Sequence, residues 1–201
     1  VLSGPKSREV LSPLTDAGLA NEDGFTWMSA KEITVSEIAV RALRVSYVGE
    51  LGWELHCPMA KLGDLHDALM QAGEAQGIRR FGTYAMNSLR LEKAYKGWGA
   101  DLTTEISLVE ADMLRFARQS GGYIGAGIVE RKKKEGVPIH LVYCEVDAVD
   151  ADPMGNEPVL SGDDIIGVTT SGGYGHTVHK SLAFAYVNSG YESPGTTFDI
   201  R

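Results

Sequence analysis

Apolar residues in the first part of the chain are spaced in a way that predicts several strands. Residues 32–47 are rich in isoleucine and valine, which favour extended backbone. Residues 53–57 alternate between apolar and polar positions, so Trp53, Leu55 and Cys57 are predicted to share one face of a short strand. These strands form the sheet of a first, mixed domain in our interpretation.

Helices are predicted between and after these strands. Residues 6–14 form a short helix that begins after Gly4-Pro5, and residues 61–77 carry leucines three and four positions apart, with Gly77 as the expected C-cap. In residues 84–95 the apolar side chains point in most directions, which predicts a helix buried on several sides. The charged residues within it, Arg90 and Glu92, then need partners, because an unpaired buried charge is costly.

The second part of the chain has a different pattern. After residue 118, glycines separate short apolar runs at 139–146, 164–169 and 181–187, which is typical of an antiparallel barrel or sandwich. Residues 131–134 form a basic run flanked by glutamates, and the pattern predicts a solvated charged segment there. We therefore expect an α+β fold with two domains, residues 1–116 and residues 117–201.

Composition excludes several classes of function. The 201 residues carry a net charge of −8, which argues against nucleic acid as a partner. The chain lacks an apolar run long enough to span a membrane. Two distant cysteines, Cys57 and Cys144, outside any CxxC pattern predict reduced thiols in a cytosol-like compartment. His176 and His179 have no third ligand at suitable spacing, so no metal site is predicted.

One predicted hairpin could hold a small molecule. If the strands on either side of Gly49 and Gly52 pair symmetrically, Tyr47 lies opposite Glu54, and their side chains share a face. A carboxylate in this position can accept two hydrogen bonds from the edge of a flat heterocycle, and a neighbouring ring can cover its face. The alternative is a surface glutamate with Tyr47 in the core.

Several motifs resemble those of the aminomethyltransferase (glycine cleavage T-protein) family, especially the folate-binding module of sarcosine and dimethylglycine dehydrogenases. They occur in family order over nearly the whole chain. The motifs are the segment at 3–7, the hairpin at 44–55, the helix at 88–95 with its continuation at 98–103, and two barrel segments at 155–159 and 167–173.

The resemblance implies four folate-binding residues. Tyr47 and Glu54 would line the pocket, with Glu54 on the pterin edge. Arg90 would be a further pocket residue, and Trp98 lies where the family often has an aromatic ring. The alternative for Arg90 is a buried pair with Glu92 or another acid.

The chain also departs from the family pattern. Glu110 to Arg115 replaces a glycine-containing Glu-Ala-Gly-Leu-Gly-like run, so this loop is expected to have another shape or to face a neighbouring domain. The family's catalytic aspartate belongs to an N-terminal portion that this chain is expected to lack. No catalytic residue is therefore assigned within the chain, and the folate-binding domain is expected to be incomplete at its N-terminus.

The function implied by the resemblance is tetrahydrofolate-dependent transfer of a one-carbon unit. The donor would be a small N-methylated amine or an aminomethyl group, and FAD would be bound by a separate N-terminal domain. Two alternatives remain: a folate-dependent demethylase of a methylated sulfur compound, and a non-catalytic folate-binding module. The implied compartment is the cytoplasm, or the mitochondrial matrix in a eukaryote.

Overall fold

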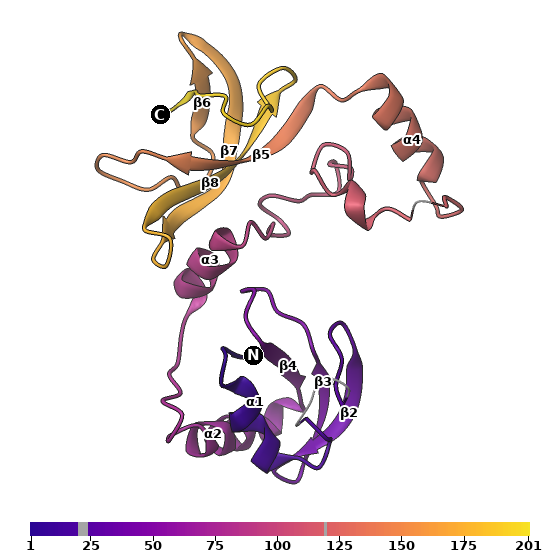
Figure 1. Cartoon of the computed structure of the whole chain (residues 1–201), viewed down its shortest axis with the longest axis vertical. Coiled ribbons are helices and arrows are strands. Elements are labelled where there is room, and N and C mark those ends of the chain that lie inside the picture. The colour runs from indigo at the N-terminus through magenta and orange to yellow at the C-terminus, as the bar shows by residue number, and fades with distance from the viewer. Residues whose placement is uncertain (20–23, 119) are drawn as a thin grey trace. The chain divides into compact units, whose positions relative to one another are not determined.

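The computed structural model describes residues 1–19, 24–118 and 120–201, and these residues form two compact units. Unit 1 is Val1–Met86 and unit 2 is Asn87–Arg201 (Figure 1). This division falls earlier in the chain than the predicted domain boundary near residue 116, which stays a prediction.

Unit 1 combines a four-stranded antiparallel sheet with two α-helices. The strands are β1 (Leu2–Ser3), β2 (Ala30–Val35), β3 (Ile38–Leu43) and β4 (Gly52–His56), arranged in the order β1-β4-β3-β2. The helices are α1 (Ser7–Leu11) and α2 (Leu62–Ala72), with short 3-10 turns at Ser12–Leu14 and Met59–Lys61. Helix α2 ends at Ala72, so the predicted end at Gly77 is wrong by one turn.

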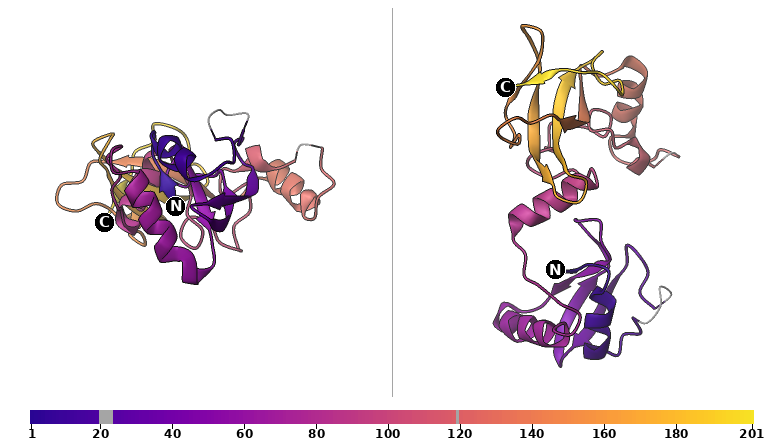
Figure 2. Two further views of the ribbon diagram at one scale, coloured as in Figure 1. Left: turned by 90° about the horizontal axis from the view of Figure 1, so that it is seen from below. Right: turned by 60° about the vertical axis from the view of Figure 1, so that its left-hand side comes forward.

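The core of unit 1 lies between the helices and one face of the sheet (Figure 2). Val10 and Leu11 of α1 and Leu65 of α2 pack with buried residues of the strands, including Val40 and Trp53. Leu55 and Cys57 pack against the same cluster, as the alternation over residues 53–57 predicted. The other face of the sheet carries both polar side chains, such as those of Glu32 and Arg41, and apolar ones, such as that of Leu43.

The β3–β4 hairpin differs from the predicted one. Its register pairs Leu43 with Glu54 and Arg41 with His56, so the expected pairing of Tyr47 with Glu54 is wrong. The reason is the connection between the strands: it is not a tight turn but a loop over residues 44–51, and Tyr47 lies within that loop. The prediction assumed that both strands continue up to the glycines.

Unit 2 is built on a five-stranded antiparallel sheet. The strands are β5 (Ile139–Val146), β6 (Pro158–Ser161), β7 (Asp164–Gly175), β8 (Lys180–Asn188) and β9 (Asp199–Ile200), in the order β5-β8-β7-β6-β9. The predicted α+β fold with a strand-rich, antiparallel C-terminal part is confirmed. Between Thr169 and Ser171 the β7–β8 register shifts, which marks a β-bulge at Thr170.

Two further α-helices and a 3-10 turn precede the sheet of unit 2 in the chain. Helix α3 (Thr83–Glu92), which begins in unit 1, buries Arg90 and Leu91, whereas Tyr84 is 86% exposed. The predicted burial on several sides is therefore wrong. Helix α4 (Ala126–Glu135) contains the basic run at 131–134 that was predicted to be a solvated charged segment, and a 3-10 turn spans Leu114–Phe116.

In the described part of the chain, the structure contains no helix that is both long and apolar enough to cross a membrane.

Candidate functional site

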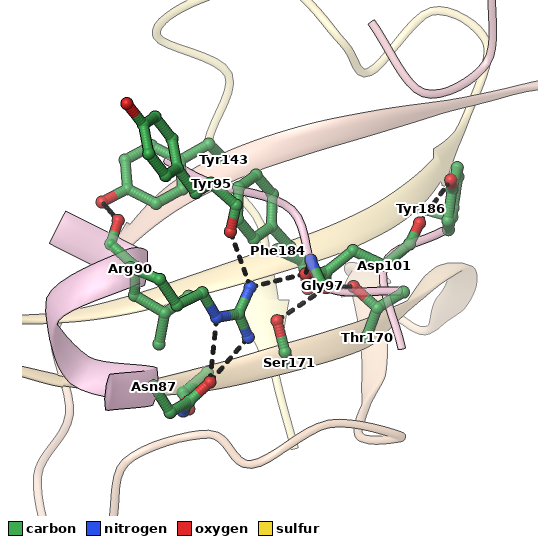
Figure 3. Close-up of polar contacts among 12 residues, drawn as sticks. Asn87, Arg90, Tyr95, Gly97, Asp101, Tyr143, Thr170, Ser171, Phe184 and Tyr186 are labelled. Atoms are coloured by element: carbon green, nitrogen blue, oxygen red, sulfur yellow. Dashed lines mark hydrogen bonds and ion pairs between the residues drawn. The ribbon is translucent and has the colours of Figure 1, made fainter. Parts of the chain in front are cut away.

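Asp101 of unit 2 is completely buried and lies at the centre of a network of hydrogen bonds (Figure 3). Its Oδ2 accepts hydrogen bonds from Arg90 Nη1 at 2.6 Å and from the backbone N–H of Gly97 at 2.7 Å. Its Oδ1 accepts from the hydroxyls of Thr170 at 2.5 Å and Ser171 at 2.6 Å. Both carboxylate oxygens are therefore satisfied by short, charge-assisted bonds.

The β-bulge explains how two neighbouring residues of β7 reach the same carboxylate. Successive side chains of a regular strand point to opposite faces of the sheet. The extra residue at Thr170 locally breaks this alternation, so Thr170 and Ser171 both donate to Asp101. The glycine-rich segment at 167–173 thus serves the Asp101 site through its hydroxyls.

Tyr186 of β8 completes the shell around Asp101 by donating its hydroxyl to the Asp101 carbonyl oxygen at 2.8 Å. Burial raises the pKa of Tyr186, and the negative charges of Asp101 and Glu110 raise it further. Tyr186 therefore stays protonated at neutral pH and keeps its role as a donor.

Arg90 is buried almost as deeply as its partner, with 4% of its side chain exposed. Its Nε and Nη2 donate to Asn87 Oδ1 at 2.9 and 2.7 Å, and Nη1 donates to the Tyr95 carbonyl at 2.9 Å as well as to Asp101. The guanidinium also lies 5.9 Å from the ring centroid of Phe184. The alternative expected for Arg90, a buried pair with Glu92 or another acid, is met by Asp101, while its folate-pocket role stays a prediction.

A second ion pair of unit 2 joins Glu110 to Lys132. Glu110 begins the segment up to Arg115 that departs from the family pattern. Glu110 is 5% exposed and accepts hydrogen bonds from Lys132 of α4 and from the Ser107 hydroxyl. Burial disfavours its charged form, but these hydrogen bonds outweigh burial, so the pKa of Glu110 lies below its usual value. In the same loop Asp112 has a φ of 52°, a left-handed conformation that aspartate tolerates better than most residues.

Glu54 of unit 1 is in a very different environment. It lies on the sheet face opposite the core, and 35% of its side chain is exposed. Its Oε2 lies 3.1 Å from His56 Nε2, and its cross-strand neighbour is the apolar Leu43. Within the described residues, His56 is the one polar side chain that contacts the Glu54 carboxylate, so several acceptor positions stay available.

An open hollow of about 490 Å³ lies on this face of the sheet. Among the residues that line it are Leu43 and His56, which flank Glu54, and Arg41, which donates from Nε to Glu32 at 2.7 Å. Glu54 does not itself line this hollow, and the carboxylate that does, Glu32, is paired with Arg41.

Two of the residues predicted to bind folate carry exposed aromatic rings. Tyr47 is 38% exposed in the loop before β4, where Ser46 Oγ accepts from the Glu50 N–H at 3.0 Å. Trp98 is 73% exposed in the loop after α3. Tyr47 and Glu54 belong to unit 1, and Arg90 and Trp98 belong to unit 2. In the described residues no cluster of three or more His, Cys, Asp or Glu side chains is arranged to bind a metal ion.

Sequence reasoning missed Asp101 and the bulge hydroxyls. The available signal was Arg90 itself, since a cation on a helix flanked by apolar residues requires an acid, and Asp101 lies only eleven residues further along the chain. The bulge leaves no comparable signal, because Thr and Ser are ordinary strand residues.

Comparisons with known proteins agree with this architecture. The chain is 42% identical over 188 residues to human "Dimethylglycine dehydrogenase, mitochondrial", covering 92% of the chain and 22% of that protein. It is 32% identical over 205 residues to "Aminomethyltransferase" of Symbiobacterium thermophilum, covering 99% of the chain and 53% of that protein. The chain therefore spans about a fifth to about half of the length of these curated relatives.

A solved structure has the same fold. The glycine cleavage system aminomethyltransferase T from Bartonella henselae superimposes with a TM-score of 0.82 at 24% identity, over 98% of this chain and 53% of that one. The family pattern described as "GCVT N-terminal domain" matches residues 1–120, and that described as "Glycine cleavage T-protein C-terminal barrel domain" matches residues 140–201. The chain belongs to the glycine cleavage T-protein (aminomethyltransferase) family.

Proposed function

We propose that the protein carrying this chain transfers a one-carbon unit to tetrahydrofolate, and that the chain forms part of its folate-binding module. The supporting observation is family membership, together with relatives that bear the names of an aminomethyltransferase and a dimethylglycine dehydrogenase. The higher identity to the dehydrogenase, 42% against 32%, favours a small N-methylated amine as the one-carbon donor.

The chain's residues suit a folate ligand. Glu54 offers a partly exposed carboxylate with free acceptor positions to a pterin edge, whose adjacent N–H groups can donate to both oxygens. Tyr47 and Trp98 offer exposed aromatic surface to a flat ring. Bound tetrahydrofolate supplies the nitrogen that accepts the one-carbon unit, while the protein residues hold and orient it so that capture becomes local.

The finer parts of the proposal concern the whole protein. In a dehydrogenase of this kind FAD oxidises the N-methyl group, and we assign FAD to no residue of this chain. The compartment is the cytoplasm or, in a eukaryote, the mitochondrial matrix; the name of the human relative includes "mitochondrial". A flavin absorbance spectrum and N-methyl amine oxidation by the full-length protein support the dehydrogenase form, and demethylation of a sulfonium compound without flavin overturns it.

The folate site is tested by Glu54→Gln in the full-length protein. The substitution keeps the size of the side chain but removes its charge and places an N–H donor against the donors of the ligand. Because a hydrogen bond to a charged group contributes about 1.5–3 kcal/mol, we expect the folate Kd to rise roughly ten- to hundredfold, measured by titration calorimetry.

Asp67→Asn is the matched control. Asp67 also forms an exposed pair with a histidine, at 2.8 Å from His66, but it lies on helix α2. The control should bind folate as the wild type does. Equal affinity in the Glu54→Gln and wild-type proteins would remove Glu54 from the folate site.

A further inference from the structure

The segment from Tyr95 to Leu102 is a short loop with one large exposed side chain. Gly99 N donates to the Leu102 carbonyl at 2.8 Å, and Asp101 N donates to the Gly97 carbonyl at 2.9 Å, so the loop is closed by its own backbone. Gly97 and Asp101 are buried, whereas the Trp98 side chain between them is 73% exposed. The loop thus presents an indole ring to its surroundings.

Arg90 and Asp101 together bind the backbone of this loop on its buried side. Nη1 of Arg90 binds the Tyr95 carbonyl at the start of the loop, and the Asp101 carboxylate binds the Gly97 N–H in its middle. The salt bridge of 2.6 Å between the two side chains joins these contacts into one unit (Figure 3). These two hydrogen bonds, at Tyr95 and at Gly97, fix the backbone immediately before Trp98.

The same pair is fastened to the sheet and to helix α3. Thr170 and Ser171 of β7 bind the carboxylate, and Asn87 of α3 binds the guanidinium. The loop therefore takes its position from two separate parts of unit 2, strand β7 and helix α3. With 4% of its side chain exposed, Arg90 presents almost no surface to a ligand.

We propose that Arg90 and Asp101 are positioning residues, which fix the loop so that Trp98 offers a preorganised stacking surface to a flat heterocyclic ligand. The proposal rests on the proposed function, because folate is the ligand it has in view. A surface that is already ordered avoids the entropy loss of ordering the loop on binding. Arg90 then acts on affinity through Trp98 and makes no contact with the ligand itself.

The first test is Trp98→Ala in the full-length protein, titrated with 5-formyltetrahydrofolate. Stacking of a ring on an aromatic side chain contributes about 1–3 kcal/mol, so we expect the Kd to rise by roughly five- to hundredfold. Because Trp98 is exposed, its loss should leave folding intact. The control is Trp27→Ala, which removes another exposed tryptophan, 55% exposed in unit 1, and should leave the Kd unchanged.

The second test separates positioning from direct contact. Arg90→Lys keeps the charge but loses the planar set of donors that reaches Tyr95, Asn87 and Asp101 together. We expect it to weaken binding, and the double variant with Trp98→Ala to bind no more weakly than Trp98→Ala alone. Fluorine NMR of fluorotryptophan-labelled protein should show the Trp98 resonance shifted or broadened in Arg90→Lys, with the Trp53 resonance unchanged.

The outcomes distinguish this inference from the proposed function. Additive losses in the double variant would show that Arg90 contacts the ligand, and they overturn the positioning role. An unchanged Kd in Trp98→Ala, with a loss in Glu54→Gln, overturns this inference and leaves the proposed function standing. If the wild-type full-length protein does not bind 5-formyltetrahydrofolate at all, the proposed function itself fails.

Discussion

Each unit holds a carboxylate paired with a nitrogen-containing side chain: Asp101 with Arg90 in unit 2, and Glu54 with His56 in unit 1. The two pairs differ in burial and in the number of hydrogen bonds that they make. Asp101 is fully buried, binds four donors through its carboxylate and faces an arginine that is 4% exposed. Glu54 is 35% exposed, contacts a histidine that is 59% exposed, and lies on the open face of a sheet. A buried pair in which both carboxylate oxygens are hydrogen-bonded stabilises the fold. A carboxylate with free acceptor positions is able to bind a ligand.

The largest expected effect comes from removing the charge of Asp101. Asp101→Ala leaves the Arg90 guanidinium buried without a counter-charge and removes the acceptor of Gly97, Thr170 and Ser171. Breaking one side of a buried pair destabilises by about 3–5 kcal/mol, so we expect a loss of this size in the free energy of unfolding, measured by denaturant titration. A loss below about 1 kcal/mol, the range of exposed pairs, would contradict the contrast between the two sites.

An intermediate effect is expected at Glu110, whose pair with Lys132 is partly exposed, with 6% of the Glu110 and 30% of the Lys132 side chain accessible. The pKa of Glu110 is lowered in the folded protein, so the stability contributed by this group is present above the ordinary glutamate pKa of about 4.3 and is lost as the pH falls through the lower, folded value. Acidification over this range should therefore cost the wild type more stability than Glu110→Gln. Thermal unfolding temperatures measured from pH 6 down to about pH 3 check this, and parallel curves would count against it.

The smallest effect on stability is expected at the exposed pair. His56→Ala removes the contact with Glu54, but exposed ion pairs contribute only about 0–1 kcal/mol because water solvates both groups and the side chains lose entropy on pairing. We expect the free energy of unfolding to change by less than about 0.5 kcal/mol under the denaturant conditions used for Asp101→Ala. A loss as large as that of Asp101→Ala would show that the Glu54 site is structural too.

Local patterns in the sequence predict most elements of the fold. The strand at 139–146 matches β5 at both ends, and the helix over 84–95 matches α3 within a few residues. Such elements are set by the spacing of apolar residues within one segment, which can be read directly from the chain. The basic run at 131–134 was predicted only as a solvated charged segment, and its helical conformation was not predicted, because lysine and arginine favour helices as well as solvated loops.

The candidate site is less predictable because it depends on register and on contacts between distant segments. Tyr47 and Glu54 were placed opposite each other on the assumption of a tight turn, and the loop at 44–51 shifts the pairing by four residues. Arg90 was expected to need an acid, but its partner is set by the route of the chain after α3. The sequence can thus predict that a buried charge needs a partner, whereas the identity of that partner follows only from the tertiary structure.

The hydrogen bonds to Asp101 have a consequence for the order in which the molecule assembles. Its hydroxyl donors lie 69, 70 and 85 positions further along the chain, on strands β7 and β8, which are synthesised after it. While those strands are still inside the ribosome, the aspartate lacks these donors, and the segment around Trp98 has only its local bonds. The position of this segment therefore depends on strands that are synthesised after it, and removing β7 or β8 would take away hydrogen bonds that hold Asp101 and, through it, the loop around Trp98.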